Sequence, residues 1–60
     1  MKKENYIYKE EGNRVTLTDK RTNTNFRGEL YIGDNGKTYA RSLDSVSMTM
    51  IAKYRKNFVK

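Results

Sequence analysis

The chain has 60 residues, of which 13 are Lys or Arg and 7 are Asp or Glu, so its formal net charge is +6. Histidine, cysteine, proline and tryptophan are absent. Their absence excludes a disulfide framework, a Cys/His zinc site and catalysis by a thiol or an imidazole. A chain of this length predicts a single domain over residues 1–60. At 35% hydrophobic residues its core must be thin.

No segment of the chain has the apolar length of a targeting or membrane-spanning element. The two lysines near the N-terminus precede no apolar run suited to a signal peptide, and the longest apolar stretch is Met50–Ala52. We therefore expect a cytoplasmic protein with no membrane partner. The 5 Tyr and 2 Phe residues are spread along the chain in strand-like contexts, which favours a folded domain over a disordered one.

The first half of the chain predicts a hairpin. Residues 6–9 are aromatic and branched, which is typical of a strand. Residues 11–13 predict a turn, and residues 14–18 then alternate apolar with polar side chains, so that Val15 and Leu17 face inward. Residues 19–23 predict a loop, because Asp19 can bond to the turn backbone and Asn23 tolerates a left-handed conformation.

Residues 26–32 alternate again and predict a further strand. One face carries Phe26, Gly28, Leu30 and Ile32, and the other carries Arg27, Glu29 and Tyr31. A glycine inside a strand indicates a bulge or the close approach of a bulky group. Residues 33–36 end in Asn-Gly and predict a type I′ turn, after which residues 37–41 return as another strand.

From Ser42 onward the apolar period becomes helical. Ser42 is the predicted N-cap, with Asp44 in the first turn, where the helix dipole favours negative charge. Six apolar side chains fall within one arc of about 140° at helical spacing. They are Leu43, Val46, Met50, Ile51, Tyr54 and Phe58. Residues 45–52 also alternate at period two and contain Ser and Thr, so a final strand stays open as the alternative.

The predicted fold is α+β: a small antiparallel β-meander of three to four strands with a C-terminal amphipathic helix packed on one face. A small SH3-like or Sm-like β-barrel, with residues 26–30 as its bent second strand, is the alternative. The predicted core consists of Ile7, Val15, Leu17, Phe26, Leu30, Ile32, Leu43, Val46, Met50, Ile51, Tyr54 and Phe58.

The residues that could carry catalysis do not form a recognisable site. Gly36-Lys37-Thr38 resembles the end of a phosphate-binding loop, but the glycine required five positions earlier is replaced by Tyr31. The carboxylates fall mostly at predicted turns and ends, where water solvates them. We therefore expect no enzymatic activity, no catalytic residue, no metal site and no cofactor.

The excess positive charge begins after residue 19. Residues 20–41 contain five basic residues and two acidic ones, which leaves +3. On the outward sheet face, Thr16 and Thr18 would lie near basic and aromatic side chains, with Tyr39 or Arg41 beside them. Lys and Arg neutralise phosphates, and Tyr rings stack on bases. The candidate nucleic-acid-binding residues are Lys20, Arg21, Arg27, Tyr31, Lys37 and Arg41.

These features predict a non-enzymatic, small basic nucleic-acid-binding protein, with duplex DNA as the expected partner. Strands followed by a helix, with basic residues on the free sheet face, are similar in layout to the arm-type DNA-binding domains of phage and transposon integrases. The resemblance implies a phage or mobile-element regulator. The alternative is a protein-binding module or inhibitor that docks on an acidic partner protein. A homodimer formed through an edge strand also stays open.

Overall fold

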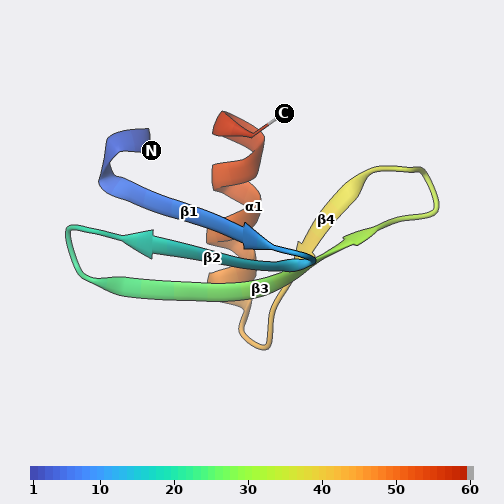
Figure 1. Cartoon of the computed structure of the whole chain (residues 1–60), viewed down its shortest axis with the longest axis horizontal. Coiled ribbons are helices and arrows are strands. Elements are labelled where there is room, and N and C mark those ends of the chain that lie inside the picture. Colours follow the sequence, from blue (N-terminus) through green and yellow to red (C-terminus); the bar gives the residue numbers. More distant parts are fainter. Residues whose placement is uncertain (60) are drawn as a thin grey trace.

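The computed structural model describes residues 1–59 and contains four strands followed by one α-helix (Figure 1). A short 3-10 helix, η1 (Lys3–Asn5), leads into β1 (Tyr6–Glu11) and β2 (Arg14–Asp19). β3 (Thr24–Ile32), β4 (Thr38–Arg41) and the helix α1 (Ser45–Phe58) follow. The strands form one antiparallel sheet in the order β1-β2-β3-β4. The predicted α+β meander is confirmed, and the alternative is wrong because the sheet does not close into a barrel.

The turn between β2 and β3 forms as its sequence predicts. The Oδ1 atom of Asp19 accepts a hydrogen bond from the backbone N–H of Arg21 at 3.0 Å. Asn23 takes the left-handed conformation, with φ 55°. Each residue thus contributes the local interaction for which its type is favoured in turns.

The connection between β3 and β4 differs from the predicted type I′ turn, which needs positive φ at both central residues. Only Gly36 has positive φ here, at 79°. Its N–H donates to the carbonyl of Gly33, and the N–H of Gly33 donates to the carbonyl of Lys37. The Asn35 side chain accepts a bond from the N–H of Lys37, which stabilises this longer loop. The type I′ prediction is therefore wrong, and β4 begins at Thr38.

The helix begins later than predicted, because Asp44 and not Ser42 is its N-cap. The Asp44 carboxylate accepts hydrogen bonds from the backbone N–H and the hydroxyl of Ser47 at 2.7 and 2.8 Å. These bonds, the backbone one foremost, hold the pKa of Asp44 below its ordinary value. The Ser42 hydroxyl instead donates to the Arg27 carbonyl and fixes the end of β4 against β3. The strand alternative for residues 45–52 is wrong, since capping favours the helix.

The core lies between α1 and the face of the sheet that it crosses (Figure 1). Its buried apolar residues are Val15, Leu17, Ile51 and Tyr54. Half-buried neighbours complete it: Tyr6, Tyr8, Phe26, Leu30, Ala40, Met50, Phe58 and Val59. Tyr54 alone contacts three aromatic rings, with centroid separations of 4.9–6.1 Å. Aromatic packing therefore replaces part of the aliphatic core that this short chain lacks.

Four predicted core residues are exposed: Ile7, Ile32, Leu43 and Val46. Tyr6 and Tyr8 face the helix, so the strand period turns Ile7 to the other side. Ile32 pairs with Thr38 at the far end of β3 and is 74% exposed. Leu43 precedes the helix, and in the first turn Ser47 is the buried residue while Val46 is exposed.

Gly28 precedes Glu29, the residue of β3 that pairs with both β2 and β4. A Cβ atom at this position would lie 2.6 Å from the Arg41 carbonyl oxygen and 3.1 Å from Cδ1 of Ile51. Real Cβ atoms essentially never lie 2.6 Å from another atom, and 3.1 Å is closer than most of their contacts, so the close approach that the sequence predicts is confirmed. The absence of a side chain allows the end of β4 and the middle of α1 to meet β3 at one point.

Candidate nucleic-acid interface

The sheet has one face packed against α1 and one free face, called here the outer face. Side chains alternate along a strand, so the outer face carries the residues between those that enter the core. They are Ile7, Lys9, Glu11, Arg14, Thr16, Thr18, Asn25, Arg27, Glu29, Tyr31, Tyr39 and Arg41. Four are basic and two are acidic, so the outer face has a net charge of +2 over the strands.

Two rows of charged side chains cross the outer face. The strand register places Lys9 beside Thr16, and Thr16 beside Arg27, in one row. The next row alternates in sign, in the order Glu11, Arg14, Glu29, Arg41. Neighbours in such a row have Cβ atoms about 4.5–5.5 Å apart. A phosphate bound at the first row would meet no acidic side chain within that row. A phosphate bound at the second row would lie next to Glu11 or Glu29.

Three flat side chains on β3 and β4 form a stack that begins at Arg41 of the second row and continues with Tyr31 and Tyr39. The rings of Tyr31 and Tyr39 are cross-strand neighbours with centroids 5.6 Å apart and planes inclined by 29°. The Arg41 guanidinium lies 5.6 Å from the centroid of the Tyr31 ring. The Nδ2 group of Asn35 donates to the Tyr39 hydroxyl at 2.8 Å. The rings are held in place and remain 44% and 40% exposed, so further flat groups can stack on them.

A shallow hollow extends from the outer face to the loop that follows β4. Its basic lining comes from Lys9, Arg14, Arg27 and Arg41. Ser42 to Asp44 form the wall beyond the last strand, and the bond from the Ser42 hydroxyl to β3 holds this wall close. Glu11 and Glu29 also line the hollow. The hollow thus offers basic groups and hydroxyls along its length, with three carboxylates, those of Glu11, Glu29 and Asp44, that oppose the binding of an anion.

The six candidate residues from the sequence lie along β3 and do not form one compact patch. Arg27, Tyr31 and Arg41 share the outer face. Lys20 and Arg21 lie in the β2–β3 turn, and Lys37 lies in the β3–β4 loop. These two connections are at opposite ends of the long axis of the molecule (Figure 1), whose extent is 36 Å. Arg21 also lies 3.6 Å from the Asp19 carboxylate, which offsets part of its charge.

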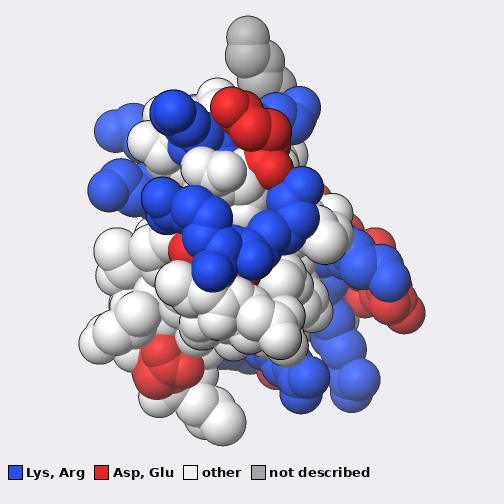
Figure 2. Space-filling view, turned by 90° about the vertical axis from the view of Figure 1, so that its left-hand side faces the viewer, with Lys and Arg blue, Asp and Glu red and all other residues white. Residues whose placement is uncertain are grey.

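η1 and the β2–β3 turn together form a basic end of the molecule, which was not predicted from the sequence. The Asn5 carbonyl accepts a hydrogen bond from the backbone N–H of Lys20, so η1 lies beside the β2–β3 turn. This places Lys2 and Lys3 near Lys20 and Arg21. Figure 2 faces this end and shows Lys and Arg side chains over its upper half, with acidic side chains among them. The register of the first hairpin could have revealed it, because that register places the residues before β1 beside the turn after β2.

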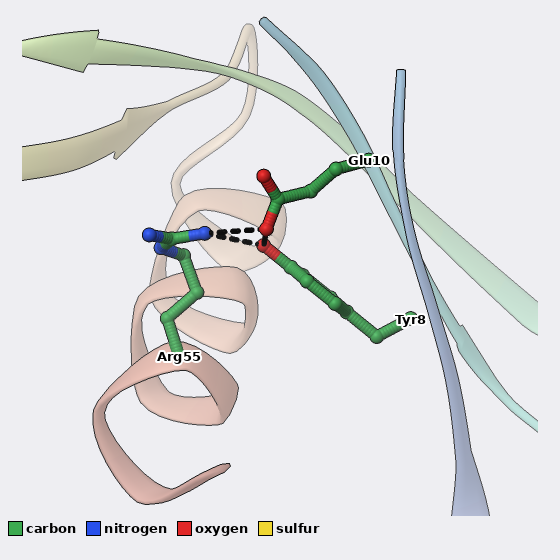
Figure 3. A network of polar contacts seen from close by, with 3 residues as sticks. All are labelled: Tyr8, Glu10 and Arg55. Atoms are coloured by element: carbon green, nitrogen blue, oxygen red, sulfur yellow. Dashed lines mark hydrogen bonds and ion pairs between the residues drawn. The ribbon is translucent and has the colours of Figure 1, made fainter. Parts of the chain in front are cut away.

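On the helix side, three polar groups connect α1 to β1 (Figure 3). The Tyr8 hydroxyl donates to Oε2 of Glu10 at 2.7 Å, and Nη1 of Arg55 donates to the Tyr8 oxygen and, at 2.9 Å, to the same Oε2 atom. Burial, followed by the hydrogen bond to Glu10, raises the pKa of Tyr8 from 10.0 to about 12. Arg55 is therefore engaged within the fold and is not available to a ligand of the outer face.

This network predicts an alkaline limit to stability. A raised pKa in the folded state means that neutral Tyr8 stabilises the fold below pH 10, the ordinary value, and that this contribution disappears as the pH rises toward about 12. Tyr8→Phe should remove the ionisation expected near pH 12 and cost about 1 kcal/mol of stability at neutral pH. A spectroscopic titration of tyrosinate measures the first effect and denaturant unfolding the second. A late ionisation step that persists in Tyr8→Phe would contradict the assignment.

Comparison with known proteins places the chain in no family: no family model, curated protein or solved structure matches it significantly. Within residues 1–59, no helix is long and apolar enough to cross a membrane. In the same range, no cluster of three His, Cys, Asp or Glu side chains is arranged to hold a metal ion.

Proposed function

We propose that the chain is a non-enzymatic nucleic-acid-binding protein that holds its ligand along β3, on the outer face. The observation that carries the proposal is the stack of Arg41, Tyr31 and Tyr39 on the same face as the basic row of Lys9 and Arg27, with the row that contains Glu29 between that basic row and the two rings. Proteins that bind single strands combine a basic track for the phosphates with aromatic rings for the bases. The outer face has both elements on one free surface.

The geometry favours a single strand over a duplex as the ligand. The exposed rings of Tyr31 and Tyr39 can stack on the face of an unpaired base, and a duplex buries those base faces in its own stack. Lys20 and Arg21 at one end of β3 and Lys37 at the other extend the track for the phosphates. Glu11 and Glu29 lie beside the track, so we expect weak, salt-sensitive binding.

The test is the binding of a fluorescent single-stranded oligonucleotide at low salt, followed by anisotropy. Tyr31→Ala should cost about 1–3 kcal/mol through lost stacking, while Tyr31→Phe should bind like the original protein. Arg27→Ala should weaken binding and lower the salt dependence by about one ion. Glu29→Gln should tighten binding, because it removes a carboxylate from the row next to Arg27.

Lys53→Ala is the matched control, since it removes one positive charge from α1, on the other side of the sheet. It should change the affinity less than Arg27→Ala does. If the two substitutions weakened binding equally, binding would depend on the net charge of the protein and not on the outer face. Absence of binding to single-stranded DNA, single-stranded RNA and duplex DNA at low salt would refute the proposed function.

A further inference from the structure

Within residues 1–59, no strand pairs with the second edge of β4, the edge that faces away from β3. β4 is the last strand in the sheet order and pairs with β3 alone. Its second edge therefore presents backbone N–H and C=O groups that another strand can pair with. In many domains such an edge accepts an extended peptide, which adds to the sheet through main-chain hydrogen bonds.

A groove accompanies this strand, between β4 and α1. Its walls include Thr38, Tyr39 and Ala40 of β4, Tyr31 of β3, and Met48, Thr49, Ala52 and Lys56 of α1. The groove thus shares the rings of Tyr31 and Tyr39 with the stack on the outer face. The two alanines are small, so the strand and the helix leave space between them where larger side chains would meet. Met48 is exposed in the groove. The groove can therefore receive apolar side chains from a strand that pairs with β4.

The charge around the groove is positive. Arg55 and Lys56 line it, and no Asp or Glu is among its lining residues in the described chain. Lys37, just before β4, and Arg41, the last residue of β4, lie at the two ends of that strand. Arg55 is already paired with Glu10. Lys56 forms no ion pair within residues 1–59 and is exposed, so it is available to a carboxylate from outside.

We propose that this groove binds an extended acidic peptide segment of another protein, which pairs with β4 as a fifth strand. Alternate apolar side chains of the segment pack against Met48 and Ala52. Its carboxylates face Lys56 and the two basic residues at the ends of β4, Lys37 and Arg41. A second copy of the chain fits less well. Antiparallel pairing of two β4 strands would bring the basic residues of both copies together.

The test uses two synthetic peptides, one alternating Glu with Val and one alternating Lys with Val, added to isotope-labelled protein. With the Glu-Val peptide, we expect NMR shifts in the amides of Thr38–Arg41 and of the α1 residues that line the groove. Amide exchange at β4 should also slow as the new strand forms. The Lys-Val peptide should produce neither effect. Shifts confined to the outer face or to the basic end near Lys20 would overturn the proposal.

Three substitutions at exposed positions separate the groove from general electrostatics. Lys56→Glu should weaken the Glu-Val peptide about tenfold, whereas Lys20→Glu, the same change at the far end of the molecule, should have much less effect. Ala52→Lys fills the groove while it adds a positive charge, and it should also weaken binding about tenfold. The proposed site in the groove would be refuted if Ala52→Lys bound the peptide more tightly. It would also be refuted if Lys56→Glu and Lys20→Glu lost equal affinity for the peptide.

Two further outcomes would reassign the same surface. If the β4 amides shifted with increasing protein concentration in the absence of peptide, the partner of β4 would be a second copy of the chain. Displacement of the peptide by a single-stranded oligonucleotide, with shifts at the α1 residues Met48, Ala52 and Lys56, would assign the groove to nucleic acid. Both would overturn the peptide proposal. Because Tyr31 and Tyr39 belong to both sites, shifts of these α1 residues, which lie on the other side of the sheet from the outer face, let the two proposals fail separately.

Discussion

Replacing Ile51 with alanine should remove a large part of the stability of the domain. Ile51 is 0% exposed and is one of the four buried apolar residues of the core within residues 1–59. Such a replacement in a packed core costs about 2–5 kcal/mol. At ordinary values per residue, the whole stability of a domain of this length is about 3–9 kcal/mol. A single buried side chain thus accounts for a large part of what keeps the helix on the sheet.

Thermal unfolding followed by circular dichroism measures this effect, and Leu43→Ala provides the control. Leu43 loses a side chain of the same size but is fully exposed, with a relative accessibility of 108%. Its replacement should change stability by less than about 0.5 kcal/mol. An Ile51→Ala melt that coincides with that of Leu43→Ala would show that α1 does not hold the fold as described.

Local patterns predicted the strands well where one face is buried and the other is exposed. Val15 and Leu17 alternate with Thr16 and Thr18, and the structure keeps that alternation. The same patterns could not show how far the helix extends over the sheet. Ile32 fits the inward face of β3 but lies beyond the reach of α1.

Aromatic residues were harder to place, because a tyrosine suits both a core and a surface. Tyr6 and Tyr8 were not predicted in the core, and their burial depends on the ring of Tyr54 from the far end of the chain. The bonds from Arg55 to Tyr8 and Glu10 likewise join residues that are 45 or more positions apart. No local period in the sequence carries such information.

The candidate interface could be predicted only in part. Strand alternation was enough to place Arg27 and Tyr31 on one face, because a strand fixes the direction of each side chain. Lys20, Arg21 and Lys37 lie in connections, where no such period applies. Their positions follow from the bends and lengths of the hairpins. The net charge thus showed that residues 20–41 are basic, whereas only the fold shows which of these basic side chains lie on the outer face.

Gly28→Ala should destabilise the domain by about 1–3 kcal/mol through overpacking. The new Cβ atom would lie 2.6 Å from the Arg41 carbonyl oxygen, a backbone atom that cannot rotate away. Arg41 is held by its pairing with Glu29, and the next residue, Ser42, is bonded to β3. The end of β4 must therefore move away from β3. Faster amide exchange in β4 than in β1 should accompany the loss.

A double variant shows which contact at Gly28 matters. Ile51→Val removes Cδ1, the other close neighbour at 3.1 Å, while it leaves the Arg41 carbonyl in place. We expect Gly28→Ala to cost nearly as much in the Ile51→Val background as in the original protein, with a coupling below about 0.5 kcal/mol. Denaturant unfolding of the four proteins measures this cycle. If Ile51→Val rescued most of the loss, the helix and not β4 would be what requires glycine at this position. If Gly28→Ala were as stable as the original protein, the close approach of the two strands would be refuted, because a backbone carbonyl at that distance leaves no space for a methyl group.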